Sequence, residues 1–187
     1  MSPARGGAEV STVPGMETYV LSVIGADRAG LVDALAEVVA DHGGSWDRSQ
    51  MTELAGVFAG VVLVRVPDGR AAAWREALVP LRERGLLEVA VRPAEGAGDL
   101  PAEAPTSSVT VVGADRPGIV HEVSHALAEL GAGIVDLRTW TESAPMAGEL
   151  LFHATAVVRL PPQVTTRDLT AALEGLADDL MVDLVET

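Results

Sequence analysis

The sequence has no cysteine and no lysine, and only 3% of its 187 residues are aromatic. Without cysteine, disulfide bonds, thiolate nucleophiles and cysteine-ligated metal sites are excluded. With so few aromatic residues, the core must be built from valine, leucine, isoleucine and alanine. No run approaches the roughly 18 apolar residues that a membrane-spanning helix needs, and no signal segment opens the chain. We therefore expect a cytoplasmic protein with no membrane partner.

The charge is strongly negative and unevenly distributed. All 13 basic residues are arginines, and 27 acidic residues give a net charge of −14. Residues 108–187 hold 12 acidic residues against 4 arginines, whereas residues 17–92 hold 11 against 8. A field of this sign repels phosphate backbones, so the composition predicts no direct binding of nucleic acid.

One motif occurs twice along the chain. Residues 25–32 read GADRAGLV and residues 113–120 read GADRPGIV, a spacing of 88 residues that persists at Gly43 and Gly131. A period this long indicates a duplicated domain, since solenoid repeats span roughly 20–50 residues.

The duplication divides the chain into four segments. Residues 1–16 are predicted to be a flexible tail, and residues 93–107 an acidic, proline-rich linker. The two domains are expected at residues 17–92 and 108–187.

Each copy predicts the same order of elements. In the first copy, an apolar run at residues 19–24 predicts a strand, and Leu31, Leu35 and Val38 have helical spacing. Two strands meeting at residues 55–56, a second helix and a last strand follow. Pro80 marks a kink or an early end of that second helix.

The second copy repeats this order, and its last predicted helix, at residues 166–178, begins with a capping box at Thr165 and Asp168. The order β-α-β-β-α-β predicts an α+β fold of two ferredoxin-like domains. Each is a four-stranded antiparallel sheet with two helices on one face. One sheet face and at least one strand edge stay open, so we also expect a homo-oligomer.

The repeated motif lies where a strand meets a helix, a place that suits an anionic ligand. Free N–H groups at a helix N-terminus favour a carboxylate. Asp27 and Asp115 are predicted to cap the helices that follow. Gly30 and Gly118 let a ligand approach the backbone without a Cβ in the way.

The strand, the Gly-Ala-Asp-Arg-Pro-Gly-Ile-Val turn and the helix that ends at glycine before Ile-Val-Asp-Leu together resemble the ACT domain. Two such domains in tandem, without a catalytic domain, resemble the glycine cleavage system transcriptional repressor group. The resemblance implies a non-enzymatic regulator that needs no cofactor or metal. It would sense a small effector, an amino acid, and act through a partner protein to regulate amino-acid (glycine) metabolism. The implied ligand-binding residues are Gly25, Asp27, Arg28, Gly30, Leu31 and Ser45, with Gly113, Asp115, Arg116, Gly118 and Ile119.

The start of the second strand departs from the family pattern. ACT domains that sense amino acids often carry asparagine there, where this chain has Ser45 and Gly133. Serine can still make one hydrogen bond, but glycine has no side chain to do so. The alternative function is therefore a ligand-free interaction or oligomerisation module. Pairing of the two copies within one chain or between two chains stays open.

Residues 121–125 match the zinc motif H-E-x-x-H. The apolar residues of this helix lie on another face, so His121 and His125 are expected to point to solvent. No third zinc ligand follows in the helical setting that such a site needs. We interpret the motif as a solvated helix face and predict no enzyme. Three tryptophans, Trp46, Trp74 and Trp140, are interpreted as packing residues.

Overall fold

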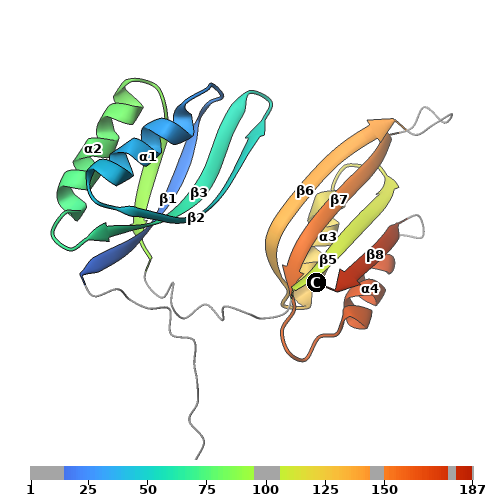
Figure 1. Cartoon of the computed structure of the whole chain (residues 1–187). Helices are drawn as coiled ribbons and strands as arrows, with labels where there is room; N and C mark the ends of the chain where they lie inside the picture. The colour runs from blue at the N-terminus through green and yellow to red at the C-terminus, as the bar shows by residue number, and fades with distance from the viewer. Residues whose placement is uncertain (1–14, 95–105, 144–149, 177–179, 187) are drawn as a thin grey trace, which may run out of the picture. The chain divides into compact units, whose positions relative to one another are not determined.

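The structure, a computed structural model, describes residues 15–94, 106–143, 150–176 and 180–186. The chain divides into two compact units, unit 1 over Met1–Leu100 and unit 2 over Pro101–Thr187 (Figure 1). Unit 1 contains β1 (Met16–Ala26), α1 (Leu31–Asp41), β2 (Ser45–Leu54), β3 (Val57–Pro67), α2 (Ala71–Glu83) and β4 (Glu88–Pro93). Unit 2 contains β5 (Thr106–Ala114), α3 (Ile119–Glu129), β6 (Gly133–Ser143), β7 (Leu150–Arg159), α4 (Thr166–Glu174) and β8 (Met181–Glu186).

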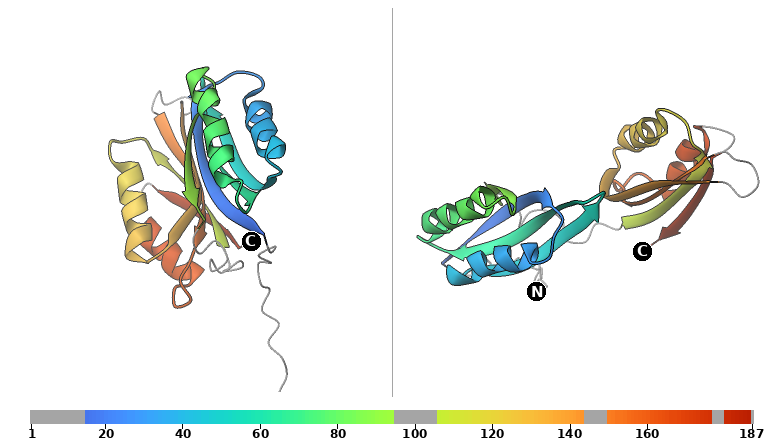
Figure 2. Two further views of the ribbon diagram at one scale, coloured as in Figure 1. Left: turned by 90° about the vertical axis from the view of Figure 1, so that its left-hand side faces the viewer. Right: turned by 90° about the horizontal axis from the view of Figure 1, so that it is seen from above.

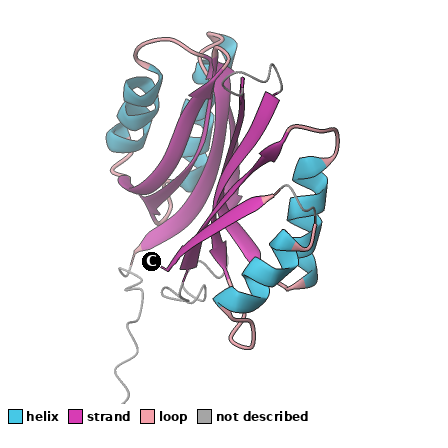
Figure 3. Ribbon diagram, turned by 90° about the vertical axis from the view of Figure 1, so that its right-hand side faces the viewer, coloured by secondary structure: helices cyan, strands magenta, loops and turns pink. Residues whose placement is uncertain are grey.

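Both units have the predicted α+β fold. The strand order is β2-β3-β1-β4 in unit 1 and β6-β7-β5-β8 in unit 2, and every strand pair is antiparallel. Within each unit the two helices cover one face of the sheet (Figures 2 and 3). The predicted β-α-β-β-α-β order is therefore confirmed in both copies.

Alternation along the strands places one face of each sheet in a core. In unit 1, Tyr19, Leu21 and Val23 of β1 are buried against the helices, together with three alternate valines of β3. Helix α1 contributes Leu31 and Leu35. The core of unit 2 is built in the same way from Val109 and other small and branched residues. Branched aliphatic side chains thus fill most of both cores, as the low content of aromatic residues predicts.

Two predicted helix ends differ from the structure. Helix α2 continues to Glu83, three residues past Pro80, so the early end is not observed. A proline removes only one N–H donor from the helix, and the burial of Leu78 and Leu81 on either side holds this turn against the core. Helix α4 ends at Glu174, four residues before its predicted end.

Each sheet contains one irregularity at the same place. The pairing of β2 with β3 shifts between Trp46 and Arg48, and the pairing of β6 with β7 shifts between Ile134 and Asp136. Asp47 and Val135 are therefore the extra residues of two matching β-bulges, which turn side chains away from regular alternation.

The tryptophans do not all behave as predicted. Trp74 is fully buried, and Trp46 packs against the same core. The prediction was wrong for Trp140, which is 45% exposed on the sheet face that carries no helix. Its ring stacks on His153 with centroids 5.1 Å apart, because both side chains point away from the helices.

The strands extend into both predicted connecting segments. β1 begins at Met16, β4 ends at Pro93 and β5 begins at Thr106. The rest of the predicted tail, residues 1–14, and residues 95–105 of the predicted linker lie outside the described residues. No helix in the described part of the chain combines the length and the apolar character that crossing a bilayer takes.

Candidate functional site

In each unit the repeated motif forms the turn between the first strand and the first helix. The N-cap residues are Gly30, with φ 90°, and Gly118, with φ 93°. Such left-handed values favour glycine, which explains why both copies keep it. No side chain caps either helix, so the N–H groups of each first turn are left without a side-chain acceptor.

The predicted caps at Asp27 and Asp115 are therefore wrong. Both residues lie three positions before the N-cap, outside the reach that capping requires. Their backbone N–H groups instead donate to the carbonyl oxygens of Gly56 and Leu150, each at 2.8 Å. These bonds tie the turn to the neighbouring strand connection, and the aspartate side chains stay exposed.

Other residues of the motif have structural surroundings. The side chains of Leu31 and Ile119 are buried in the cores, so only their backbone N–H groups could meet a ligand. The N–H of Ile119 already donates to the carbonyl oxygen of Arg116 at 3.3 Å. A Cβ at Gly25 would lie 2.4 Å from the carbonyl oxygen of Leu86, so glycine is needed there for packing. Gly113, its equivalent in unit 2, is buried.

The two arginines of the motif have different partners. Arg116 forms an ion pair with Glu122, with 2.6 Å between Nη1 and Oε1. Arg28 donates from Nη2 to the carbonyl oxygen of Gly85, and no carboxylate among the described residues pairs with it. Arg28 has no acidic partner of this kind because α1 has Ala34 at the position where α3 has Glu122.

The Glu122 carboxylate lies at the place predicted for a ligand. Its Oε1 is 3.9 Å from the position of a Cβ on Gly118, beside the uncapped start of α3. The hydrogen bond from Arg116 holds the pKa of Glu122 below its usual value of 4.5. Nothing lies within 4 Å of the same position on Gly30. Unit 2 thus fills with its own side chain a place that unit 1 leaves open.

The structure does not bring Ser45 to the turn of its own unit. Ala26 pairs with Val57 and Val57 with Leu54, so the turn lies at the far end of β2 from Ser45. At ~3.3 Å per residue, the separation along the strand is about 30 Å. Gly133 lies equally far from the turn of unit 2 because the register is the same.

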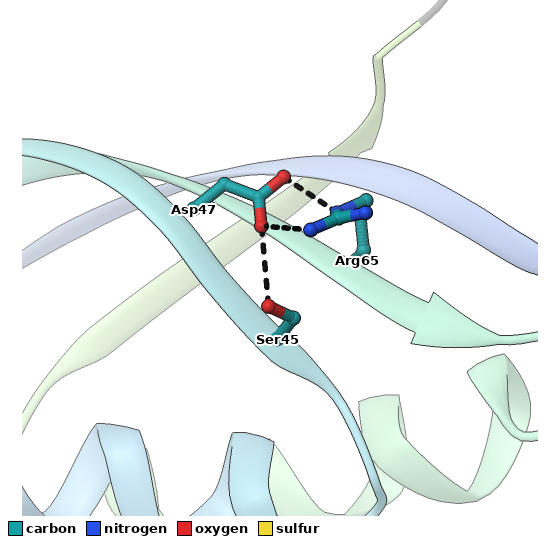
Figure 4. A network of polar contacts seen from close by, with 3 residues as sticks. All are labelled: Ser45, Asp47 and Arg65. Carbon is teal, nitrogen blue, oxygen red and sulfur yellow. Dashed lines mark hydrogen bonds and ion pairs between the residues drawn. The ribbon is translucent and has the colours of Figure 1, made fainter. Parts of the chain in front are cut away.

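Ser45 also takes part in a polar network that the sequence did not indicate (Figure 4). Its hydroxyl donates to Oδ1 of Asp47 at 3.2 Å. Arg65 approaches the same carboxylate with two nitrogens, Nη2 at 2.9 Å from Oδ1 and Nε at 2.7 Å from Oδ2. The Ser45 hydroxyl is therefore engaged within unit 1.

The H-E-x-x-H segment lies on α3 with both histidines exposed, as predicted. Their rings stack with centroids 5.9 Å apart, and Glu122 between them is engaged by Arg116. Among the described residues, no group of three or more histidine, aspartate or glutamate side chains could hold a metal ion.

Unit 2 also has an open groove that contains none of the predicted site residues. It lies along α4, has a volume of about 600 Å³, and is lined by Thr166, Arg167, Thr170, Ala171, Glu174 and Leu184. The sequence carried no signal for it beyond the helix itself.

The comparisons with known proteins agree with the duplicated fold. A solved structure of an unknown protein from Galdieria sulphuraria is 28% identical, with 92% of this chain and 99% of that chain covered and a TM-score of 0.78. A structure entitled "putative glycine cleavage system transcriptional repressor" is 17% identical, with 92% and 99% covered and a TM-score of 0.68. At that identity the likeness supports the fold alone. No curated protein matches the sequence significantly.

The family model of the ACT domain matches residues 17–91 and again residues 108–185. These two stretches are the two copies of the repeat, and together they take up most of the chain. The chain therefore belongs to the ACT domain family, as a tandem of two ACT domains.

Proposed function

We propose that this tandem ACT protein is a non-enzymatic regulator that binds the carboxylate of a small effector, an amino acid, at the β1–α1 turn of unit 1. One observation carries the proposal. Unit 1 keeps Arg28 and the uncapped start of α1 open at the place where unit 2 holds its own Glu122 carboxylate. In the unit 2 turn, the Glu122 carboxylate thus has the position that we propose for the ligand carboxylate in unit 1.

The physical basis is a pair of anion-binding features at one turn. The partial positive charge of a helix N-terminus and its free N–H groups attract a carboxylate. A guanidinium that lacks an acidic partner adds charge-assisted hydrogen bonds. Arg28 has only a neutral carbonyl partner, and Gly30 presents no Cβ. In unit 2, Glu122 competes with any ligand for Arg116, so we assign sensing to unit 1.

The effector would act on a partner protein. A ligand shifts an equilibrium between two states only by its differential affinity for them, and a partner protein reads that shift. Transcriptional regulation of amino-acid (glycine) metabolism is supported by the resemblance of the motif. The acidic surface favours action through a protein partner and disfavours direct contact with DNA.

The test is a thermal-shift panel of amino acids at about 10 mM on the full chain. A ligand whose dissociation constant is near 100 μM stabilises the folded state by about 2.7 kcal/mol. For a unit of this size, that corresponds to a rise in melting temperature of roughly 10 °C or more. Arg28→Gln is expected to lose this rise. Arg70→Gln is the matched control, because Arg70 is exposed and makes no cap hydrogen bond.

A flat panel, or a rise that persists unchanged in Arg28→Gln, would contradict the proposed site. The measured quantity is the ligand-induced shift, so a change in the melting temperature of the free variant does not affect the conclusion.

The second candidate is a ligand-free interaction or oligomerisation module. The sheet faces without helices expose apolar side chains, including Ile24 (48%) and Val61 (48%) in unit 1 and Trp140 (45%) in unit 2. Faces of this kind mark interaction surfaces, and we expect a homo-oligomer. Sedimentation equilibrium tests this, since Val61→Glu should lower the measured mass whereas the helix-surface variant Val79→Glu should not.

A further inference from the structure

The second helices of the two units can be compared residue by residue, because each begins in the same way. The fourth residue of each helix, Trp74 in α2 and Leu169 in α4, donates its backbone N–H to the carbonyl oxygen of the N-cap residue, at 3.0 and 3.1 Å. Both side chains are fully buried. Trp74 and Leu169 are therefore equivalent, and so are the next residues, Arg75 and Thr170.

The strand register gives another equivalent pair on the sheet below these helices. Tyr19 of β1 pairs with Val64 of β3, and Ser107 of β5 pairs with Val158 of β7. Both Tyr19 and Ser107 are buried. They have the same spacing of 88 residues as the repeated motif, so serine has in unit 2 the place that tyrosine has in unit 1.

Unit 1 fills the space between this helix and the sheet with long side chains. The ring centroids of Tyr19 and Trp74 are 5.2 Å apart, and the guanidinium carbon of Arg75 lies 4.9 Å from the centroid of the Tyr19 ring. Unit 2 has three shorter side chains at the equivalent positions, namely Ser107, Leu169 and Thr170. A smaller side chain leaves room unless its surroundings collapse onto it.

Thr170 lines the open groove of about 600 Å³ along α4, together with Ala171 and Leu184. The Thr170 hydroxyl already donates to the carbonyl oxygen of Thr166 at 3.1 Å, so it is not available as a donor to a ligand. The groove therefore suits a large apolar side chain. Arg167 also lines it, and a guanidinium over an aromatic ring is a favourable contact.

The groove lies beside the edge of a sheet. β8 is the last strand in the order β6-β7-β5-β8, so within the described part of unit 2 it has a partner strand on one side only (Figure 1). Its six residues span about 20 Å. Leu184 of β8 packs on the core side, towards the helices. A strand added to this edge turns every second side chain to that same side, where α4 lies.

The sequence of α4 and β8 is acidic. Residues 166–186 contain one basic residue, Arg167, against the acidic residues Asp168, Glu174, Asp178, Asp179, Asp183 and Glu186. The equivalent residues of unit 1, 71–93, contain four arginines and three glutamates. Complementary charge steers partners together and excludes wrong ones. A basic partner is therefore favoured at the edge of unit 2 and not at that of unit 1.

We propose that the β8 edge and the α4 groove bind an extended, basic segment of a partner protein, which adds a strand to the sheet and places an aromatic side chain in the groove. The partner's ring takes up room that unit 1 fills with its own long side chains. This surface uses none of the residues of the effector site. It gives the partner protein of the proposed function a place to bind, and it rests on that function only for its regulatory role.

The test is a titration of the full chain with the capped peptide Arg-Val-Arg-Phe-Arg-Val-Arg, followed by NMR of the backbone amides. Alternation puts the phenylalanine and the valines on one face of the added strand and the arginines on the other. We expect saturable shifts at Thr170 and Leu184, and none at Trp140 on the opposite edge strand. A peptide with serine in place of phenylalanine should bind about tenfold more weakly or worse, because it leaves the groove unfilled.

A variant of the chain tests the groove itself. Thr170→Phe fills the groove with a ring from within the chain and is expected to weaken binding of the phenylalanine peptide by about tenfold. Ala128→Phe is the matched control, because Ala128 is an exposed residue of α3 that does not line the groove. It should leave the affinity unchanged.

The strand pairing is tested by N-methylation of the peptide backbone. Only every second N–H of an added strand faces β8. Two peptides, N-methylated at the odd or at the even residues, should therefore differ, with one losing binding and the other keeping it. Binding that both peptides keep would overturn the addition of a strand.

Other results would also overturn the proposal. One is an affinity that is unchanged in Thr170→Phe, and another is equal binding of the serine peptide, which would leave charge as the whole attraction. A third is a Leu184 signal that shifts with protein concentration in the absence of peptide, which would assign the edge to a second copy. Arg28→Gln should leave peptide binding intact, so failure of this surface and failure of the effector site are distinguishable.

Discussion

Four arginines of the two units differ in whether a carboxylate pairs with them. Arg116 meets Glu122 and Arg65 meets Asp47, both within their own unit. Arg28 and Arg159 have no such partner among the described residues. Each unit therefore has one arginine with a carboxylate partner and one without, at exchanged positions in the two units. We assign effector binding to the turn at Arg28 because an internal ion pair must be broken before a ligand can use the turn at Arg116.

Glu122→Gln tests this difference at the unit 2 turn. The substitution removes the charge that holds Arg116 and should open the turn to the effector that unit 1 binds. We expect the amides of Gly118 and Ile119 to shift on addition of the effector in this variant and not in the wild-type protein. NMR titration measures both.

Glu129→Gln is the control, because Glu129 is an exposed glutamate of the same helix that does not reach Arg116. The pKa of Glu122 lies below 4.5 because of the bond from Arg116. The pair therefore persists at neutral pH and is lost only as the pH falls through that lowered pKa. If the Gly118 and Ile119 amide signals do not shift in Glu122→Gln, then Glu122 is not what keeps the effector from this turn.

Among the elements, α4 has the best-defined start in the described structure. The Thr165 hydroxyl accepts from the backbone N–H of Asp168 at 3.2 Å, and the Asp168 carboxylate accepts from the backbone N–H of Thr165 at 2.9 Å. This reciprocal pair is the predicted capping box, and it is confirmed. By contrast, α1 and α3 begin at glycines without a side-chain cap.

Thr165→Ala is expected to cost about 1 kcal/mol of the stability of unit 2. That would lower its melting temperature by about 4–8 °C, as measured by circular dichroism. Asp27→Ala is the informative control, since the sequence predicts a cap at Asp27 and the structure has none. It should change stability by less than about 0.5 kcal/mol. A larger loss for Asp27→Ala than for Thr165→Ala would reverse this assignment of caps.

The capping box of Thr165 and Asp168 makes the stability of α4 dependent on pH in the acid range. Hydrogen bonds from Thr165 hold the pKa of Asp168 below its ordinary value of 3.8. A group whose pKa is lowered on folding stabilises the fold above its unfolded pKa, and this contribution is lost as the pH falls through the folded pKa. Unit 2 should therefore lose stability below about pH 4 through this group, and Asp168→Asn should reduce that dependence.

At the scale of the whole molecule, net charge limits the partners. The chain carries −14, and residues 108–187 carry 12 acidic residues against 4 arginines. We expect no binding of duplex DNA in fluorescence anisotropy at 50 mM salt, where electrostatic binding would be strong. Binding that weakens steeply as salt increases would contradict the proposal that the protein acts through a protein partner.

The sequence alone determined the duplication, the order of elements and the fold class of both units. These features follow from local patterns: apolar residues that alternate in strands, apolar residues at helical spacing, and glycines at the ends of elements. Such patterns can be recognised without the structure. The same applies to the capping box at Thr165, whose two partners are three residues apart. The sequence also located the turn of each copy, although it assigned the caps to Asp27 and Asp115 in error.

Only the tertiary structure decided which arginine lacks a carboxylate partner. Arg65 and Asp47 are 18 residues apart and Arg28 and Gly85 are 57 apart, and they meet through strand register, a bulge and the packing of a loop. A one-residue shift in register turns every side chain of a strand to the opposite face. Equivalent arginines in two similar sequences can therefore end with different partners. Their availability for a ligand depends on contacts between distant segments, which local patterns do not encode.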